Sequence, residues 1–350
     1  MASRHRAWAE VDLDAFRSNL KETAKMAGGA EVWPVLKANA YGHGAKATAR
    51  VCEEEGIARI GVGDSGEALE LRGHGIATPL LVLGTVIDSE LPDMLSHGIE
   101  VGVHSELRAR ELGALAAESG SILGVHLKID TGMARLGVRP EAALRVAKTI
   151  AESPALSLRG VMTHFSSASA GKDASGQQAL FVSVLGEIRD AGIEIPSVHC
   201  ASSASLLSDG DFMGDAVRPG ITLFGILPPG LADVAPLRPV LSLRAQVVFL
   251  KDLPAGAPVG YGGKWTSHRP TRLATLPIGY NDGVPYRLGA QGRGSALIRG
   301  TRCPIVGAVS MDYCTVDVGH VPGTELGDVA TLIGRDGVEE IRTEEVANAA

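Results

Sequence analysis

The chain has 350 residues, of which 45% are hydrophobic and 21% are charged, and this is enough for one large core and a second domain. Its net charge is -7, and acidic and basic residues are mixed along the whole length. No block of like charge is available to hold nucleic acid or an anionic membrane. These features favour a small-molecule partner.

The N-terminus and the cysteines indicate the cellular compartment. Residues 1–14 lack the apolar run of ~7–15 residues that a signal peptide needs, and no stretch has the ~18 apolar residues of a membrane span. Cys52, Cys200, Cys303 and Cys314 are scattered without a C-x-x-C pair, so neither a zinc site nor a disulfide framework is indicated. We predict a cytoplasmic protein with buried thiols and no metal.

Short apolar runs alternate with segments of helical period between about residues 31 and 225, which is typical of a parallel sheet covered by helices. The candidate strands are Val32–Lys37, Arg59–Gly63, Leu80–Gly84, Glu100–His104, Gly124–Asp130, Gly160–His164, Ser197–Ala201 and Ala216–Arg218. The helices between them include Gly44–Glu55, Glu106–Glu118, Pro140–Glu152 and Gln177–Asp190. These are eight strands, the number that closes a TIM barrel. A doubly wound open sheet is the alternative, disfavoured because no G-x-G-x-x-G turn follows the first strand.

The pattern changes after Pro228-Pro229-Gly230, a candidate linker, to β-type runs separated by turn residues. These runs are Leu241–Leu250, Leu273–Ile278, Ala296–Ile298, Ile305–Val309, Cys314–Val318 and Val329–Ile333. We predict an α/β chain with an N-terminal (β/α)8 TIM barrel over residues 1–235 and a C-terminal mainly-β domain over residues 236–350. Residues 1–10 can belong to either domain.

Polar residues at the carboxyl ends of barrel strands are candidates for the active site, because that end of the barrel carries the chemistry. They are Lys37, Arg135, His164, Ser203, Arg218 and the Gly220-Ile221 turn. Taken singly, each has an ordinary explanation. A strand-end lysine is usually solvated, and Arg218 could pair with Asp215. A buried lysine, however, loses its proton easily, as imine formation requires.

Five motifs in order carry a resemblance to a known family. Val35–Gly44 (VLKANAYGHG) is similar to the cofactor-lysine motif of alanine racemases, and it is highly specific. The others are Leu127–Gly137 (LKIDTGMARLG), Thr163-His164-Phe165, Arg218-Pro219-Gly220-Ile221, and Gly307–Asp312 with Val316-Asp317-Val318. The resemblance covers nearly the whole chain. It implies a barrel that binds pyridoxal 5'-phosphate (PLP), a C-terminal β domain, and a homodimer with shared active sites.

Racemisation with PLP needs one base on each face of the planar intermediate. By resemblance, Lys37 is both the cofactor anchor and one base, and Tyr261 of the partner subunit is the other. A tyrosine with a pKa of ~10 needs cationic or hydrogen-bonding neighbours to act as a base, and His164 and Arg218 are candidates. As bare sequence, Tyr261 would pass for a turn residue among glycines.

Further roles follow from the resemblance alone. Arg218 would face the pyridine nitrogen of PLP, where a donor that keeps its proton leaves that nitrogen unprotonated. Arg135 would lie near the cofactor's phenolic oxygen and the substrate carboxylate. Lys128 matches a position that is often carbamylated in the family. A carbamate there would orient Arg135, and the alternative is an ordinary strand lysine.

The phosphate group would be held by hydroxyls and backbone amides rather than by a charged clamp. The predicted residues are Tyr41, Ser203, Gly220 and Ile221, with His164 as a further cofactor contact. The family usually has asparagine where this chain has Ser202, so Ser202 is an alternative to Ser203.

The β domain carries two motifs that the family places at the substrate entrance. Met311 and Asp312 resemble residues that reach the partner's site, and Tyr280 resembles an entrance residue. The resemblance also places a further β segment, with a tyrosine that contacts the phosphate, after the helix predicted at residues 344–350. The sequence ends at Ala350. It is therefore either a truncated product or a member without that contact.

The resemblance predicts interconversion of L- and D-alanine, which supplies D-alanine for peptidoglycan. One alternative is a racemase for serine or for many amino acids, or a related lyase, because a pocket often discriminates one small group by only ~1–3 kcal/mol. A PLP-binding protein without turnover is a second alternative. The third is a cofactor-free barrel enzyme whose arginines hold a phosphorylated substrate.

Overall fold

The computed structural model describes residues 5–166, 174–207, 214–227, 236–290 and 292–350. The chain divides into two compact units. One is Leu13–Arg238, and the other combines Met1–Asp12 with Pro239–Ala350. The linker predicted at residues 228–230 lies outside the described residues.

The first unit is a parallel sheet in the order β2-β9-β8-β7-β6-β5-β4-β3. Its strands are β2 (Glu31–Val32), β3 (Ile60–Val62), β4 (Leu80–Val82), β5 (Glu100–Val103), β6 (Leu123–Lys128), β7 (Leu156–Met162), β8 (Val198–Ser202) and β9 (Ala216–Arg218). A parallel bridge between Val35 and Gly61 joins the two ends of the sheet. Gly61 donates to the Pro34 carbonyl and Leu36 donates to the Gly61 carbonyl, both at 2.8 Å. The sheet therefore closes into the predicted barrel.

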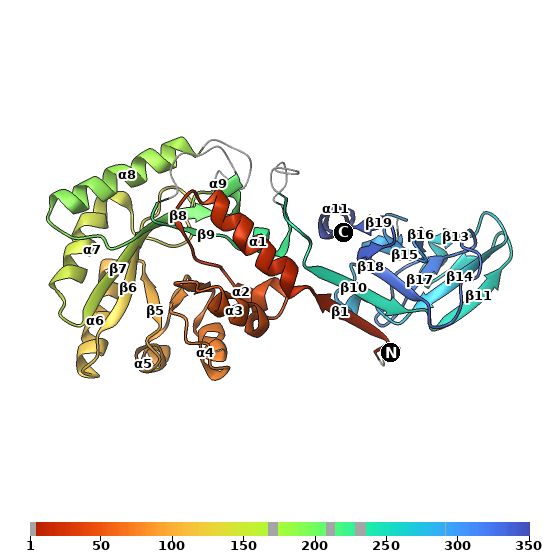
Figure 1. Cartoon of the computed structure of the whole chain (residues 1–350), viewed down its shortest axis with the longest axis horizontal. Helices are drawn as coiled ribbons and strands as arrows, with labels where there is room; N and C mark the ends of the chain where they lie inside the picture. The colour runs from red at the N-terminus through yellow and green to blue at the C-terminus, as the bar shows by residue number, and fades with distance from the viewer. Residues whose placement is uncertain (1–4, 167–173, 208–213, 228–235, 291) are drawn as a thin grey trace. The chain divides into compact units, whose positions relative to one another are not determined.

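Helices cover the outside of this sheet (Figure 1). The helices of this unit are α1 (Leu13–Met26), α3 (Ala45–Glu54), α4 (Ser65–Gly73), α5 (Leu91–Ser96), α6 (Glu106–Glu118), α7 (Pro140–Glu152) and α8 (Ser175–Asp190). Two short segments, α2 (Lys37–Tyr41) and α9 (Ser203–Leu207), contribute instead to the cavity described below. Ser105 caps α6 by accepting a hydrogen bond from the Arg108 amide. The buried positions of α6 recur at helical spacing, at Ala109, Leu112, Gly113 and Ala116.

The second unit is an antiparallel sheet in the order β1-β10-β18-β15-β16-β17-β14-β11, with β19 beside β18. Its strands are β1 (Ala7–Val11), β10 (Leu241–Gln246), β11 (Phe249–Leu253), β14 (Thr271–Leu276), β15 (Ser295–Ile298), β16 (Thr301–Val306), β17 (Cys314–Asp317), β18 (Val329–Asp336) and β19 (Glu339–Ile341). The short strands β12 (Pro258–Val259) and β13 (Trp265–Thr266) pair separately. The helices of this unit are α10 (Arg287–Ala290) and α11 (Thr343–Ala349). The predicted fold class, a barrel followed by a mainly-β domain, is confirmed.

Three sequence predictions differ from the structure in detail. The first strand was predicted to continue to Lys37, but β2 ends at Val32 and Lys37 begins α2. The run Leu241–Leu250 was predicted as one strand, but it is divided between β10 and β11, which pair with different partners. The run Ile305–Val309 ends early, since Gly307 has a φ of 73°.

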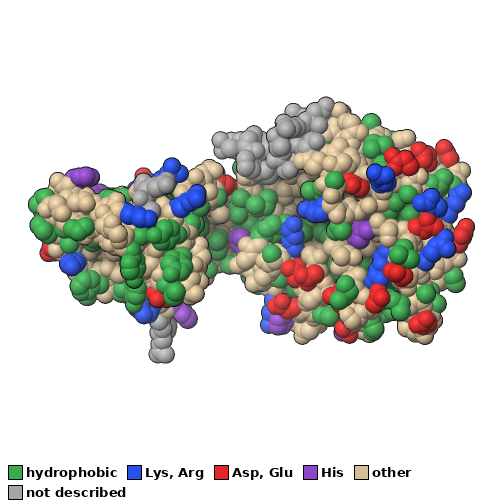
Figure 2. Space-filling model, turned by 180° about the vertical axis from the view of Figure 1, so that it is seen from behind, with side chains coloured by type: hydrophobic (Ala, Val, Ile, Leu, Met, Phe, Trp, Pro, Cys, Tyr) green, Lys and Arg blue, Asp and Glu red, His purple; other side chains and the backbone are tan. Residues whose placement is uncertain are grey.

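Two other findings concern burial and the membrane. All four cysteine side chains are buried, as predicted. Across the described ranges, no helix is long and apolar enough to cross a membrane. Acidic and basic side chains are mixed over the barrel face seen in Figure 2, in line with their mixing along the sequence.

The barrel should depend on the buried face of α6. Leu112 is 0% exposed and Leu107, on the same helix, is 67% exposed. We expect Leu112→Ala to lower the free energy of unfolding by about 2–5 kcal/mol, because it leaves a cavity. Leu107→Ala should change it by less than about 0.5 kcal/mol. Thermal or urea unfolding of the two variants would measure the difference, and equal stabilities would contradict the assigned burial.

Candidate active site

A cavity of about 510 Å³ opens at the carboxyl ends of the barrel strands. All the site residues that the sequence predicted within Leu13–Arg238 line it, namely Lys37, Tyr41, Lys128, Arg135, His164, Ser203, Arg218, Gly220 and Ile221. Ser202 lines it too. The lining includes lysines and arginines from four segments, and none of the described residues that line it is acidic. The cavity is therefore suited to an anionic ligand.

Lys37 stands at the start of an unusual left-handed turn. Ala38, Asn39, Ala40 and Tyr41 all have φ between 51° and 55°, a region that costs a non-glycine residue roughly 1–2 kcal/mol. The Glu67 carboxylate accepts hydrogen bonds from the amides of Ala38 and Gly63. The turn is thus held by contacts from outside it, as strained functional turns are.

The Lys37 side chain itself is exposed in this chain. This exposure agrees with the ordinary solvated environment of a strand-end lysine. Lys37 nevertheless lines the cavity. Burial acts instead on Lys128, which is 8% exposed, and it lowers the pKa of that ammonium to about 8.

Arg218 is buried at the end of β9 and makes three hydrogen bonds. Its Nη2 donates to the carbonyls of Thr163 (2.7 Å) and Cys200 (3.3 Å), and its Nη1 lies 2.8 Å from Nδ1 of His199. The alternative partner, Asp215, instead accepts from the Val198 amide. Burial lowers the pKa of Arg218 to about 10, so the guanidinium keeps its charge at neutral pH.

His164 lies among these cations. Burial, and after it the charges of Arg218, Lys128, Arg135 and Lys37, together lower its pKa to about 3. The imidazole is therefore neutral at physiological pH. It can donate or accept one hydrogen bond at each nitrogen without adding a charge to the cavity.

Arg135 is carried by a loop that one carboxylate organises. Oδ1 of Asp130 accepts hydrogen bonds from the amides of Gly132, Met133 and Ala134, at 2.9–3.0 Å. Burial opposes ionisation of Asp130, but these three bonds hold its pKa below the usual value. The loop presents the exposed Arg135 side chain to the cavity.

Hydroxyls and a backbone amide meet at the other side of the cavity. Oγ of Ser203 accepts from the Gly220 amide at 2.9 Å and lies 3.0 Å from Oγ1 of Thr222. A Cβ on Gly220 would lie 2.2 Å from Oη of Tyr41. Only glycine leaves this close approach open. Ser202 contacts the Ser205 hydroxyl at 3.4 Å, so Ser203 is the serine beside Gly220.

The predicted residues of the second unit form a separate exposed group. Tyr261 is 75% exposed and lines a shallow hollow with Ser310 and Tyr313. The Tyr280 amide donates to the Ser310 carbonyl, and the Asn281 amide donates to the Met311 carbonyl. Tyr280, Met311 and Asp312 are therefore brought together on two hydrogen-bonded turns, and all three are exposed.

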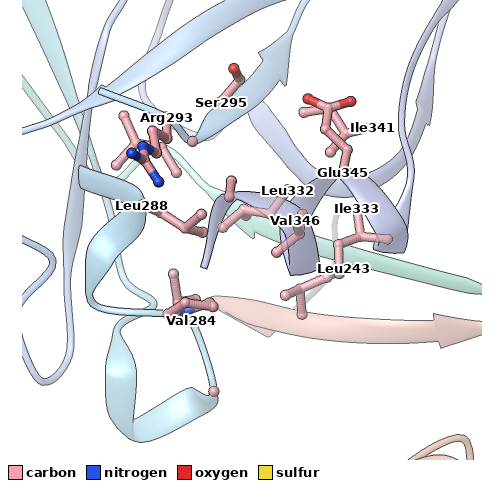
Figure 3. A pocket seen from close by; sticks show the side chains of 15 residues that line it. Leu243, Val284, Leu288, Arg293, Ser295, Leu332, Ile333, Ile341, Glu345 and Val346 are labelled. Atoms are coloured by element: carbon pink, nitrogen blue, oxygen red, sulfur yellow. The ribbon is translucent and has the colours of Figure 1, made fainter. Parts of the chain in front are cut away.

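The second unit also contains an apolar pocket between β10, β18, α10 and α11 (Figure 3). Leu243, Val284, Leu288, Leu332 and Val346 line it. Its charged lining residues are Arg293 and Glu345. Among its described lining residues, none is a buried nucleophile or general base, so we assign no chemistry to it.

Sequence reasoning missed several residues that hold the site together. Asp130 could have been found, because Asp-Thr-Gly is a sequence that favours a turn closed by the aspartate side chain. Glu67 gives no local signal, since it lies 29 positions from Ala38. The contact between His199 and Arg218 joins neighbouring strands and is likewise invisible in the sequence.

A closed barrel with a cationic cavity at its carboxyl end, in one chain with an antiparallel β unit, defines a class of two-domain enzyme whose cavity is suited to an anionic ligand. The family models for the alanine racemase N-terminal domain and C-terminal domain match residues 11–228 and 240–350. The chain belongs to the alanine racemase family.

Individual relatives agree with this assignment. The chain is 37% identical over 350 residues to an alanine racemase of Methanococcus maripaludis, covering 98% of this chain and 93% of that protein. It is 38% identical to one of Symbiobacterium thermophilum, covering 98% and 91%. The solved alanine racemase of Streptomyces lavendulae has a TM-score of 0.93 at 32% identity, covering 99% and 92%. A histidine racemase of Leuconostoc mesenteroides has a TM-score of 0.87 at 30% identity, covering 99% and 93%.

Proposed function

We propose that this protein is a PLP-dependent racemase that interconverts L- and D-alanine and so supplies D-alanine for peptidoglycan. The observation that carries the proposal is the convergence of Lys37, Lys128, Arg135 and Arg218 on one cavity without an acidic lining residue among those described. PLP is an anion with a phosphate at one end, and this set of donors fits it. The approach of Tyr41 to Gly220 beside Ser203 fits the phosphate end.

When bound, PLP withdraws electrons from the α-carbon of an attached amino acid and thereby acidifies its α-proton. Lys37 would hold the cofactor, and its amine, once released, would take or return that proton on one face. Arg218, which keeps its proton, would donate to the pyridine nitrogen and leave it unprotonated. Arg135 would orient the phenolic oxygen and the substrate carboxylate. His164 would add a neutral cofactor contact, and the amide of Ile221 would complete the phosphate contacts.

Tyr261 would act as the base on the opposite face, from the partner subunit of a homodimer. Its exposure in the single chain supports this, as does the exposure of Tyr280, Met311 and Tyr313 on the same unit. Large apolar side chains exposed together are typical of an interface. Met311, Asp312 and Tyr280 would border the substrate entrance.

The relatives named above favour alanine over a broader substrate range. Three of these four proteins are alanine racemases. The histidine racemase of similar fold keeps a second candidate open, because the same barrel can serve a larger side chain. A panel of L-amino acids that includes alanine, serine and histidine, each followed by chiral analysis, would separate the two.

Replacement of Lys37 tests the cofactor assignment. The purified protein should absorb at the wavelengths of lysine-bound PLP, and borohydride should fix the cofactor to Lys37. Lys37→Ala should lose both the covalent attachment and racemisation. Lys46→Ala, which removes an exposed lysine from α3, should retain both. Racemisation by Lys37→Ala would refute the assignment, and a colourless wild-type protein that turns over would favour a cofactor-free enzyme.

Hybrid dimers test the shared active site. Lys37→Ala and Tyr261→Phe should each be inactive as homodimers, but a heterodimer of the two has one site with both bases intact. Random mixing of the two variants should therefore recover about a quarter of wild-type activity per subunit, as expected for two-fold symmetric sites. No recovery, with exchange of subunits verified by a tag, would mean that both bases come from one chain.

Lys128 would carry a carbamate that orients Arg135. Neutral amine adds to the carbon of CO₂ and loses a proton to give the N-carboxylate, so the reaction needs the deprotonated lysine. Because burial lowers the pKa of Lys128 to about 8, the neutral fraction is appreciable near neutral pH and rises as pH passes through 8. A carbamate also turns one of the four clustered cations into an anion.

We therefore expect protein equilibrated with ¹³C-bicarbonate to show a carbamate carbon signal in NMR that grows as pH rises through this range. Lys128→Arg should lack the signal, because its guanidinium does not form a carbamate. Lys148→Arg, at an exposed site on α7, should keep it. A signal that persists in Lys128→Arg would assign the carbamate elsewhere.

A further inference from the structure

A chain of hydrogen bonds runs from Arg218 through the interior of the barrel to its opposite end. Nη1 of Arg218 lies 2.8 Å from Nδ1 of His199, and Nε2 of His199 lies 2.8 Å from Nδ1 of His126. Nε2 of His126 lies 2.8 Å from Oε2 of Glu100, the first residue of β5. Both imidazoles are 0% exposed. This hydrogen-bonded relay of Arg218, His199, His126 and Glu100 links the cavity to the amino-terminal end of the strands.

The end of the chain at Glu100 is held by Arg59. Nη2 of Arg59 donates to Oε1 of Glu100 at 3.0 Å, and Nε lies 2.7 Å from Oε2. The guanidinium also lies over the ring of Trp33, at 4.3 Å from its centroid. Trp33 in turn contacts the His199 and His126 rings, with centroids at 4.7 and 6.0 Å. These contacts fix the orientation of every ring in the chain.

Donor and acceptor rules determine where each proton lies. An arginine has only donors, so Nδ1 of His199 must be an acceptor, and its proton must be on Nε2. That proton makes Nδ1 of His126 the acceptor and leaves the His126 proton on Nε2, directed at the carboxylate. All three hydrogen bonds are satisfied when both histidines are neutral with the proton on Nε2 and Glu100 is ionised. No other arrangement of protons on two neutral rings satisfies all three.

The electrostatics agree with this assignment. Burial lowers the pKa of His126, and burial together with the Arg218 charge lowers that of His199 well below its usual value, so both rings stay neutral. Burial opposes ionisation of Glu100, but the hydrogen bonds from His126 and Arg59 hold its pKa below the usual value. Room for the relay is provided by Gly160, where a Cβ would lie 2.8 Å from Nδ1 of His126.

We propose that Glu100 is a positioning residue for Arg218, which it orients through the fixed tautomers of His126 and His199. The Glu100 carboxylate accepts the hydrogen bond from Nε2–H of His126. This keeps Nδ1 of His199 unprotonated, so that it can accept the hydrogen bond from Arg218. If the tautomers were reversed, Nδ1–H of His199 would face Nη1–H of Arg218, and the guanidinium would have to turn away. The kinetic consequence rests on the proposed contact between Arg218 and PLP, whereas the proton positions do not.

The proton positions can be measured directly. In the holoenzyme labelled with ¹⁵N-histidine, the imidazole shifts distinguish Nε2–H, Nδ1–H and doubly protonated rings, and His126→Phe and His199→Phe assign the signals. We expect Nε2–H on both rings, unchanged between about pH 5.5 and 9, where an ordinary histidine would titrate. An Nδ1–H tautomer or a protonated ring at either position would overturn the proposal, whether or not the protein racemises alanine.

Glu100→Gln tests the functional link. The two carboxylate oxygens of Glu100 accept from the N–H groups of His126 and Arg59. A glutamine has only one oxygen, so its NH₂ group must face one of these donors. We expect the His126 and His199 signals to shift or divide between tautomers. In the same variant, kcat should fall on the order of tenfold, the usual effect of losing a partner that orients a site residue, with KM little changed.

The matched control is Glu106→Gln on α6. Glu106 also pairs with two arginines, Arg110 and Arg145, but these pairs are exposed and lie outside the relay. It should leave both the imidazole signals and kcat unchanged. A folded Glu100→Gln protein with wild-type tautomers and wild-type kcat would overturn the proposal. If this variant does not fold, the tautomers of the wild-type protein decide the matter.

Discussion

The arrangement of this molecule depends on one electrostatic constraint, the concentration of positive charge in a partly enclosed cavity. Lys37, Lys128, Arg135 and Arg218 all line it, and the described lining offers no carboxylate in return. Like charges brought together in a medium of reduced dielectric raise the energy of the protein. Burial is the main reason that the pKa values of Lys128 and His164 are lowered, and the neighbouring cations lower both further. An anion of matching shape would relieve this repulsion, so the charge pattern indicates the kind of ligand that the cavity suits.

The barrel makes such a concentration possible because rigid elements hold each cation in place. Arg218 is fixed by carbonyls of two neighbouring strand ends, Thr163 and Cys200. The Arg135 loop is tied to Asp130, and the turn after Lys37 is tied to Glu67. Acidic groups are therefore present near the site, but they bind backbone amides. In this way the protein uses carboxylates to hold the backbone without neutralising the side chains that face the cavity.

Much of this could be predicted from the sequence, and the exceptions have physical reasons. Helices α6 and α7 begin and end at the predicted residues, because a serine cap, an early proline and a regular apolar period all act locally. The cavity residues of the barrel were predicted because they belong to short motifs in a fixed order. The left-handed turn after Lys37 was not predicted, since its alanines do not favour that backbone conformation. The His126–His199 contact depends on strand register, which no local pattern encodes.

The strand β1 gives the chain an unusual order of assembly. Residues Ala7–Val11 pair with residues 241–245 of β10, which follow about 230 residues later in the chain. A ribosome adding ~5–20 residues per second needs roughly 10–50 s to make that stretch. During that time the complete barrel sequence has emerged and can fold, while the first strand still waits for a partner. The first strand to be synthesised can therefore pair only after the barrel sequence is complete. Once paired, β1 links the N-terminus of the polypeptide to the β unit that follows the barrel.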